Sequence, residues 1–118
     1  VSPIGLGADG ATYNLNADFA AGALAGALGA KKFILMTDVP GVLSDPDDPN
    51  SLISELTREQ AERMLNNGRV SGGMIPKLQA CLHALERGCP RVHIIDGRIP
   101  HALLIEVFTD TGIGTMIR

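Results

Sequence analysis

The sequence is poor in cysteine, has no run of basic residues and contains no long apolar segment, and each absence excludes a class of protein. Two cysteines among 118 residues are too few for a small secreted domain held by disulfides, and no secretory signal precedes the first strand-like residues. The 10 lysines and arginines are scattered among 13 acidic residues, so no nucleic-acid or membrane partner is expected. Free thiols and a cytoplasmic location are expected.

The longest apolar stretch, residues 19–28, is too short to cross a bilayer. Its Gly22 and Gly26 form a small-xxx-small pair, which we expect to let a soluble helix pack closely against a sheet. A content of 45% hydrophobic and 19% charged residues is typical of one globular domain. Because the sequence opens in a strand-like segment without methionine, we expect it to be a fragment of a longer protein.

Strand-like and helix-like segments alternate along the chain. The expected strands cover residues 1–5, 33–36, 92–95 and 115–117, with a short extended piece at 11–15, and the expected helices cover 18–28, 57–68, 75–86 and 100–108. The apolar run 33–36 is typical of a strand buried on both faces of a parallel sheet, and residues 39–50 are expected to be an exposed loop. We predict a three-layer α/β/α sandwich with a mainly parallel sheet, forming one domain over residues 1–118.

Two patterns resemble known sites but lack part of what those sites require. Residues 5–10 match GxGxxG, yet the segment that follows is extended and no acidic residue lies about twenty positions later, so a hairpin turn is favoured over a dinucleotide loop. The spacing of the cysteines and histidines at 81, 83, 89 and 93 is not that of a zinc knuckle. Structural packing is favoured there, and no metal ligand is assigned.

Three polar segments are better candidates for chemistry. Asn14 and Asn16 share one side of an extended segment that leads to Asp18 at a helix start. Helix capping would also explain Asn16 and Asp18. Residues 37–41 follow a buried strand, where open α/β sheets bind ligands, unless they form only a turn. Lys77 lies in the first turn of a helix after two glycines, a position that favours a bound phosphate over a solvated lysine.

Together these segments resemble the amino acid kinase family, and within it the acetylglutamate kinases. The resemblance covers all 118 residues and rests on Asn14-x-Asn16-Ala17-Asp18, Leu35-x-Thr37-Asp38-Val39-x-Gly41-Val42-Leu43 and Gly73-Met74-Ile75-x-Lys77. It implies the carboxyl-terminal, nucleotide-binding half of such a kinase. The family's amino-terminal half, with its glycine-rich phosphate loops, a second catalytic lysine and most of the acetylglutamate pocket, is absent from this sequence.

The resemblance also implies an activity and a set of site residues. The activity would be phosphorylation of the side-chain carboxylate of N-acetyl-L-glutamate, a step of arginine biosynthesis, by ATP with Mg²⁺. Lys77 and Asp18 would be catalytic, and Asn14 and Asn16 would bind the substrate. The nucleotide would contact Thr37, Asp38, Val39, Gly41, Val42, Leu43, Gly73, Met74 and Lys77. The alternatives are another amino acid kinase, such as an aminoadipate-derivative kinase, or a nucleotide-binding module without turnover.

The end of the sequence resembles the arginine-inhibited subgroup of these kinases through His93, Glu106 and Gly112. In that subgroup the equivalent residues help to hold arginine, the feedback inhibitor. The subgroup also implies a homo-oligomer, and its members from photosynthetic organisms bind the PII signalling protein. The alternative is that Glu106 is a solvated helix residue and His93 a core histidine with its hydrogen bonds satisfied.

Overall fold

The computed structural model describes residues 1–109 and 112–118. The elements, in chain order, are β1 (Ile4–Leu6), β2 (Thr12–Asn14), α1 (Ala17–Ala27), β3 (Phe33–Thr37), β4 (Glu55–Leu56), α2 (Arg58–Asn66), α3 (Met74–Glu86), β5 (Val92–Asp96), α4 (Ala102–Phe108) and β6 (Thr115–Ile117). Within these described ranges, no helix is long and apolar enough to cross a membrane.

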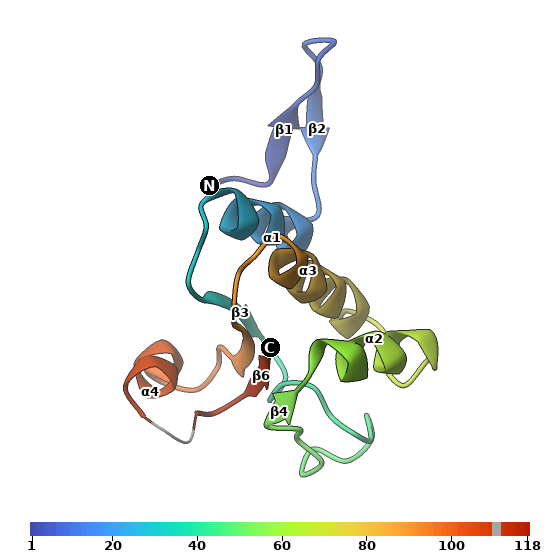
Figure 1. Cartoon of the computed structure of the whole chain (residues 1–118), viewed down its shortest axis with the longest axis vertical. Helices are drawn as coiled ribbons and strands as arrows, with labels where there is room; N and C mark the ends of the chain where they lie inside the picture. The colour runs from blue at the N-terminus through green and yellow to red at the C-terminus, as the bar shows by residue number, and fades with distance from the viewer. Residues whose placement is uncertain (110–111) are drawn as a thin grey trace.

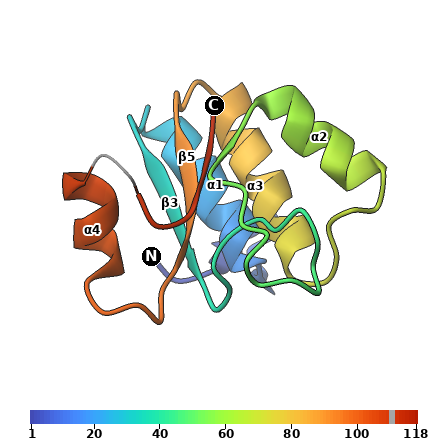
Figure 2. The same ribbon diagram turned by 90° about the horizontal axis from the view of Figure 1, so that it is seen from below.

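Four strands form the central sheet, in the order β3-β5-β6-β4. The pairs β3–β5 and β4–β6 are parallel, whereas β5 and β6 are antiparallel. Figure 2 shows α1, α3 and α2 side by side on one face of the sheet and α4 on the other. The prediction of a three-layer α/β/α sandwich with a mainly parallel sheet is therefore confirmed.

Both β3 and β5 were predicted to be buried strands, and the structure confirms this for β5 but not for β3. All five residues of β5 are buried, because α1 and α3 cover one face of the sheet and α4 packs against β5 on the other. In the edge strand β3, Phe33 and Leu35 are buried while Met36 is 52% exposed. The prediction that residues 39–50 are exposed was also wrong at Gly41 and Val42, which are buried, Val42 as part of the core.

Helices α1 and α3 approach each other closely through the small residues of α1. A Cβ atom on Gly22 would lie only 2.7 Å from the carbonyl oxygen of Ala80 in α3, and one on Gly26 would meet the Arg87 side chain. The expectation that these glycines pack against the sheet was therefore wrong, since they face a neighbouring helix. The close approach brings the first turns of α1 and α3 into reach of each other.

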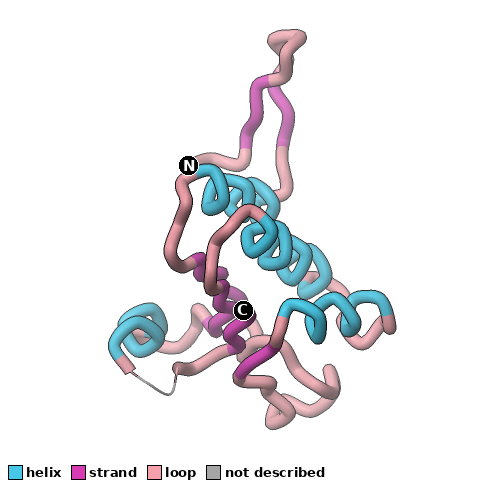
Figure 3. Tube along the Cα trace, in the orientation of Figure 1, coloured by secondary structure: helices cyan, strands magenta, loops and turns pink. Residues whose placement is uncertain are grey.

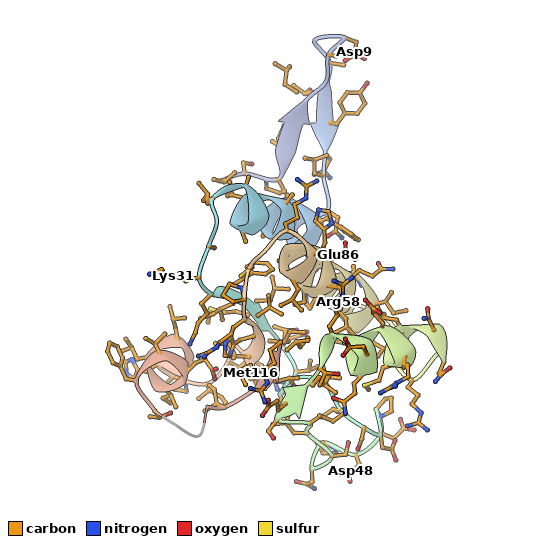
Figure 4. All side chains as sticks on the ribbon, in the orientation of Figure 1. Asp9, Lys31, Asp48, Arg58, Glu86 and Met116 are labelled. Atoms are coloured by element: carbon orange, nitrogen blue, oxygen red, sulfur yellow. The ribbon has the colours of Figure 1, made fainter. Side chains whose placement is uncertain are left out.

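Two further local predictions hold. Helix α2 begins with the expected capping box, in which the Gln60 N–H donates to Thr57 Oγ1 at 3.3 Å and the Thr57 N–H donates to Gln60 Oε1 at 2.7 Å. The GxGxxG segment runs from the end of β1 into the turn of the antiparallel β1–β2 hairpin, with Gly10 at φ 79°. This hairpin extends away from the body of the molecule (Figures 1 and 3), with Asp9 at its tip (Figure 4).

Candidate functional site

A pocket of about 360 Å³ lies at the carboxyl end of β3, between the loop that follows this strand and the start of α3. Its lining includes all the residues predicted to contact a nucleotide: Thr37, Asp38, Val39, Gly41, Val42, Leu43, Gly73, Met74 and Lys77. Four further lining residues were not predicted: Pro46, Arg69, Val70 and Ser71. Val70 and Ser71 directly precede the double glycine, whereas no sequence pattern indicated Pro46 or Arg69.

A single buried threonine holds one wall of this pocket in place. The Val42 N–H donates to Thr115 Oγ1 at 2.9 Å, and the Thr115 hydroxyl donates to the Ile53 carbonyl at 2.7 Å. Thr115 is fully buried in β6, and a Cβ on Gly41 would lie 2.7 Å from its hydroxyl oxygen. The loop after β3 is thus fastened to β6, which explains the burial of Val42. Sequence reasoning missed Thr115 because its partners are distant in the chain.

Lys77 and Asp18 form an ion pair between the first turns of α3 and α1. Lys77 Nζ lies 3.0 Å from Asp18 Oδ2 and 3.3 Å from Oδ1, and the side chains are only 21% and 19% exposed. Asn16, not Asp18, caps α1, because Asn16 Oδ1 accepts the N–H groups of Asp18 and Phe19. The alternatives of a freely solvated Lys77 and a capping Asp18 are therefore wrong.

The start of α3 is suited to an anion. Its N-cap residue, Gly73, supplies no side-chain hydrogen bond to the helix; instead the Met74 and Ile75 N–H groups donate to the carbonyls of Ser71 and Gly72 at 3.3 and 3.2 Å. Lys77, paired with Asp18, places its ammonium group at the positive end of the helix dipole. A phosphate group beside Lys77 would bring a negative charge to this positive end of the helix.

The two asparagines predicted to bind substrate lie apart from this pocket, whose lining includes neither of them. Asn14 is exposed in β2, on the projecting hairpin. The side-chain oxygen of Asn16 is used in capping α1. The structure thus brings together the predicted nucleotide residues and the Lys77–Asp18 pair, but it does not bring Asn14 into the same pocket.

A second pocket, also of about 360 Å³, lies between β5, β6 and the helix α4. Its lining includes His93, Glu106 and Gly112, the three residues predicted to hold an effector. The other lining residues, none of them predicted, are Lys32, Ser54, Glu55, Thr109, Gly114 and Met116. Met116, labelled in Figure 4, lies in β6 beside His93.

His93 and Glu106 are both buried in this second pocket, with side chains 6% and 7% exposed. Glu106 Oε2 accepts the Ile113 N–H at 3.0 Å, while Oε1 lies 2.5 Å from His93 Nδ1. That approach is not aligned as a hydrogen bond, and neither ring nitrogen has a hydrogen-bond partner among the described residues. Burial lowers the pKa of His93, against the opposing effect of Glu106. The alternative of a solvated Glu106 is therefore wrong, whereas His93 is buried as the alternative expected, with Nδ1 facing the Glu106 carboxylate.

The cysteines lie in the core, as the packing interpretation expected. Cys81 and Cys89 are free and buried, and desolvation, reinforced by the nearby Asp18, raises the pKa of Cys81 to about 12. Such a thiol is unreactive at neutral pH. Packing accounts for both residues without a role in either pocket.

Comparison with known proteins identifies the family. The model of the amino acid kinase family matches residues 1–96. The acetylglutamate kinase of Symbiobacterium thermophilum is 57% identical over 117 residues, which are 99% of this chain and 40% of that protein. The chain thus spans about 40% of the length of this curated relative.

Solved structures of N-acetylglutamate synthase from Neisseria gonorrhoeae have the same fold. The complex with coenzyme A and N-acetyl-glutamate has a TM-score of 0.85 at 33% identity, over 98% of this chain and 26% of that one. The complex with coenzyme A and L-arginine has a TM-score of 0.87 at 32% identity, over 99% and 26%. Sequence and structure agree that this chain belongs to the amino acid kinase family.

Proposed function

We propose that this chain is the nucleotide-binding domain of a kinase that transfers the terminal phosphate of ATP to the side-chain carboxylate of N-acetyl-L-glutamate. The observation that carries the nucleotide role is the pocket at the end of β3, with Lys77 in its lining and the start of α3 beside it. The acceptor is supported by the 57% identity to an acetylglutamate kinase. Arginine biosynthesis would be the pathway served.

The proposed reaction needs charge neutralisation more than proton transfer. A carboxylate is already ionised at neutral pH, so its attack on a phosphoryl group requires no general base. Lys77 would neutralise the charge that develops on the phosphate oxygens, and Asp18 would hold the lysine in position. ATP would supply the phosphoryl group, and the mainly apolar wall at Val42, Leu43 and Met74 would receive its adenosine.

Mg²⁺ would arrive with the nucleotide. Among the residues that the structure describes, no group of three or more histidine, cysteine or acidic side chains could hold a metal ion by itself. Mg²⁺ commonly keeps several waters and binds through substrate phosphates, which fits the lining described above. Asn14 would contact acetylglutamate from the hairpin, and Asn16 would contribute only its side-chain nitrogen.

The first prediction separates binding from catalysis. The 118-residue chain should bind ADP weakly and show no phosphorylation of N-acetyl-L-glutamate, because catalysis by positioning needs groups on both sides of the reacting phosphate. A chimaera, in which this chain replaces the matching segment of the Symbiobacterium thermophilum enzyme, should be active. The measurements are calorimetry for ADP and a coupled ADP-release assay for turnover.

Each arm of that experiment has its own contradicting outcome. Turnover by the isolated chain would contradict the assignment of part of the catalytic machinery to segments outside it. If the 118-residue chain does not bind ADP, the proposed nucleotide-binding role is wrong. An inactive chimaera that still binds ADP would favour the alternative of a binding module without turnover.

We also propose that the pocket of His93, Glu106 and Gly112 binds arginine as an effector. A guanidinium presents a planar set of donors that fits a carboxylate and backbone carbonyls, and Glu106 offers such a carboxylate in a buried setting. The related synthase, at 32% identity, has been solved in complex with L-arginine. By the same family resemblance we propose a homo-oligomer, PII as a further partner in a photosynthetic source, and a cytoplasmic location.

The second prediction tests this effector pocket. Glu106→Ala should weaken arginine binding by about tenfold, which corresponds to roughly 1.4 kcal/mol, because the carboxylate would no longer pair with the guanidinium. Glu106→Gln, which retains the shape of the side chain, should have a similar effect. Calorimetry on the 118-residue chain measures both, with citrulline as the uncharged control ligand.

The effector proposal fails if the wild-type chain does not bind arginine, or binds citrulline equally well. It also fails if both Glu106 variants bind arginine as tightly as the wild type. Because Glu106→Gln preserves the packing against Gly112, a loss of affinity in this variant is not explained by unfolding.

A further inference from the structure

The lining of the nucleotide pocket contains a second cationic residue, Arg69, in addition to Lys77. Arg69 lies in the loop between α2 and α3, where its N–H donates to the Met64 carbonyl at 3.1 Å. Lys77 instead reaches across to Asp18 in α1. Helix α3 lies between α1 and α2 in both views (Figures 1 and 2), so Lys77 turns to the α1 side of α3 whereas Arg69 follows the end of α2.

The anchorage of α2 fixes the position of this second cationic residue. The Arg58 guanidinium at the start of α2 donates to Glu86 at the end of α3, with a distance of 2.8 Å; both residues are labelled in Figure 4. Met64 is buried in the core beneath the last turn of α2. The loop that carries Arg69 is therefore held between two packed helices.

The surroundings of Arg69 differ from those of Lys77. Its chain neighbour Val70 is buried, and the other lining residues outside the start of α3 include the apolar Leu43 and Pro46. Arg69 itself is exposed, and the side-chain hydrogen bonds and ion pairs found among the described residues include none from its guanidinium. The apolar lining residues Leu43, Pro46 and Val70 suit a flat, weakly polar group better than a phosphate.

We infer that Arg69 forms the base end of the nucleotide pocket, with its guanidinium plane stacked on the face of the purine ring. The inference rests on the proposed nucleotide-binding function. With the phosphates at Lys77 and the start of α3, the base extends toward Val70 and Pro46, where Arg69 covers it. Guanidinium groups are planar and weakly hydrated, so they stack on aromatic rings more readily than lysine does.

The test compares ADP with inorganic pyrophosphate, which has the phosphates but no base. Arg69→Leu should weaken ADP binding to the 118-residue chain by about fivefold, and Arg69→Lys should weaken it almost as much because the charge is kept but the plane is lost. Pyrophosphate affinity should be unchanged in both variants. Arg63→Leu, at an exposed arginine outside the pocket lining, is the matched control.

The outcomes distinguish this inference from the function on which it rests. An equal loss of ADP and pyrophosphate affinity would show that Arg69 contacts phosphate, and unchanged ADP affinity in Arg69→Leu would show that it contacts nothing; either result overturns the inference while leaving the nucleotide role intact. Wild-type ADP affinity in Arg69→Lys would overturn the stacking. If the unsubstituted chain binds no ADP, the proposed function fails and the inference fails with it.

Discussion

Lys77→Ala should lower the kcat of the active chimaera by a factor on the order of a hundred or more, with a smaller effect on the KM for N-acetyl-L-glutamate. The Lys77 side chain lines the pocket and is only 21% exposed, so few water molecules could take the place of its ammonium group. Because it would act on charge that develops in the transition state, its loss should affect turnover more than substrate binding. Steady-state kinetics with both substrates measures the two parameters.

The control for this variant is Lys31→Ala, which removes an exposed lysine outside both pocket linings. Its kcat should equal that of the unsubstituted chimaera. If Lys77→Ala also leaves kcat unchanged while lowering the melting temperature, Lys77 serves only as the structural partner of Asp18, and the catalytic assignment is wrong.

Asp18→Asn should slow turnover by about tenfold or more while the domain stays folded. The substitution keeps the size of the side chain but removes the charge that fixes Lys77 Nζ at 3.0 Å, so the lysine samples other positions and the alignment required for transfer is lost. Turnover of the chimaera and the melting temperature of the 118-residue chain are the two measurements.

Asn16→Ala separates this positioning role from helix capping. It removes the side chain that accepts the N–H groups of Asp18 and Phe19, so it should cost about 1 kcal/mol of stability with less effect on turnover than Asp18→Asn. If Asp18→Asn unfolds the domain instead, the carboxylate is a structural element and the ion pair does not act in catalysis.

Local patterns predicted most of the fold, because the signals that define a helix or a buried strand are contained within a few residues. The capping box at Thr57 and Gln60 is one example, and the fully buried β5 is another. In contrast, β4 consists of Glu55 and Leu56 alone and is defined by its pairing with β6. A strand of this length has no periodicity to detect.

In the site, too, the residues that could be predicted have signals in the neighbouring sequence, whereas those that were missed depend on contacts between distant parts of the chain. The segments around Thr37 and Gly73 could be predicted because polar residues follow the end of a buried strand in one and a double glycine before a helix in the other. The contribution of Thr115 could not, since it depends on hydrogen bonds to Val42 and Ile53 across the sheet. Arg69 was missed for a related reason, because only the packing of α2 beside α3 brings it to the pocket.

The most direct test of the central claim is to map ADP onto the 118-residue chain by methyl NMR. Binding in the proposed pocket should shift the methyl signals of Val42, Leu43, Val70 and Met74, which line it, and leave Met116 in the effector pocket unperturbed. Lys77→Ala should reduce these shifts at equal ADP concentration. Shifts confined to the hairpin or to Met116, or no shifts at saturating ADP, would contradict the assignment of this chain as a nucleotide-binding domain.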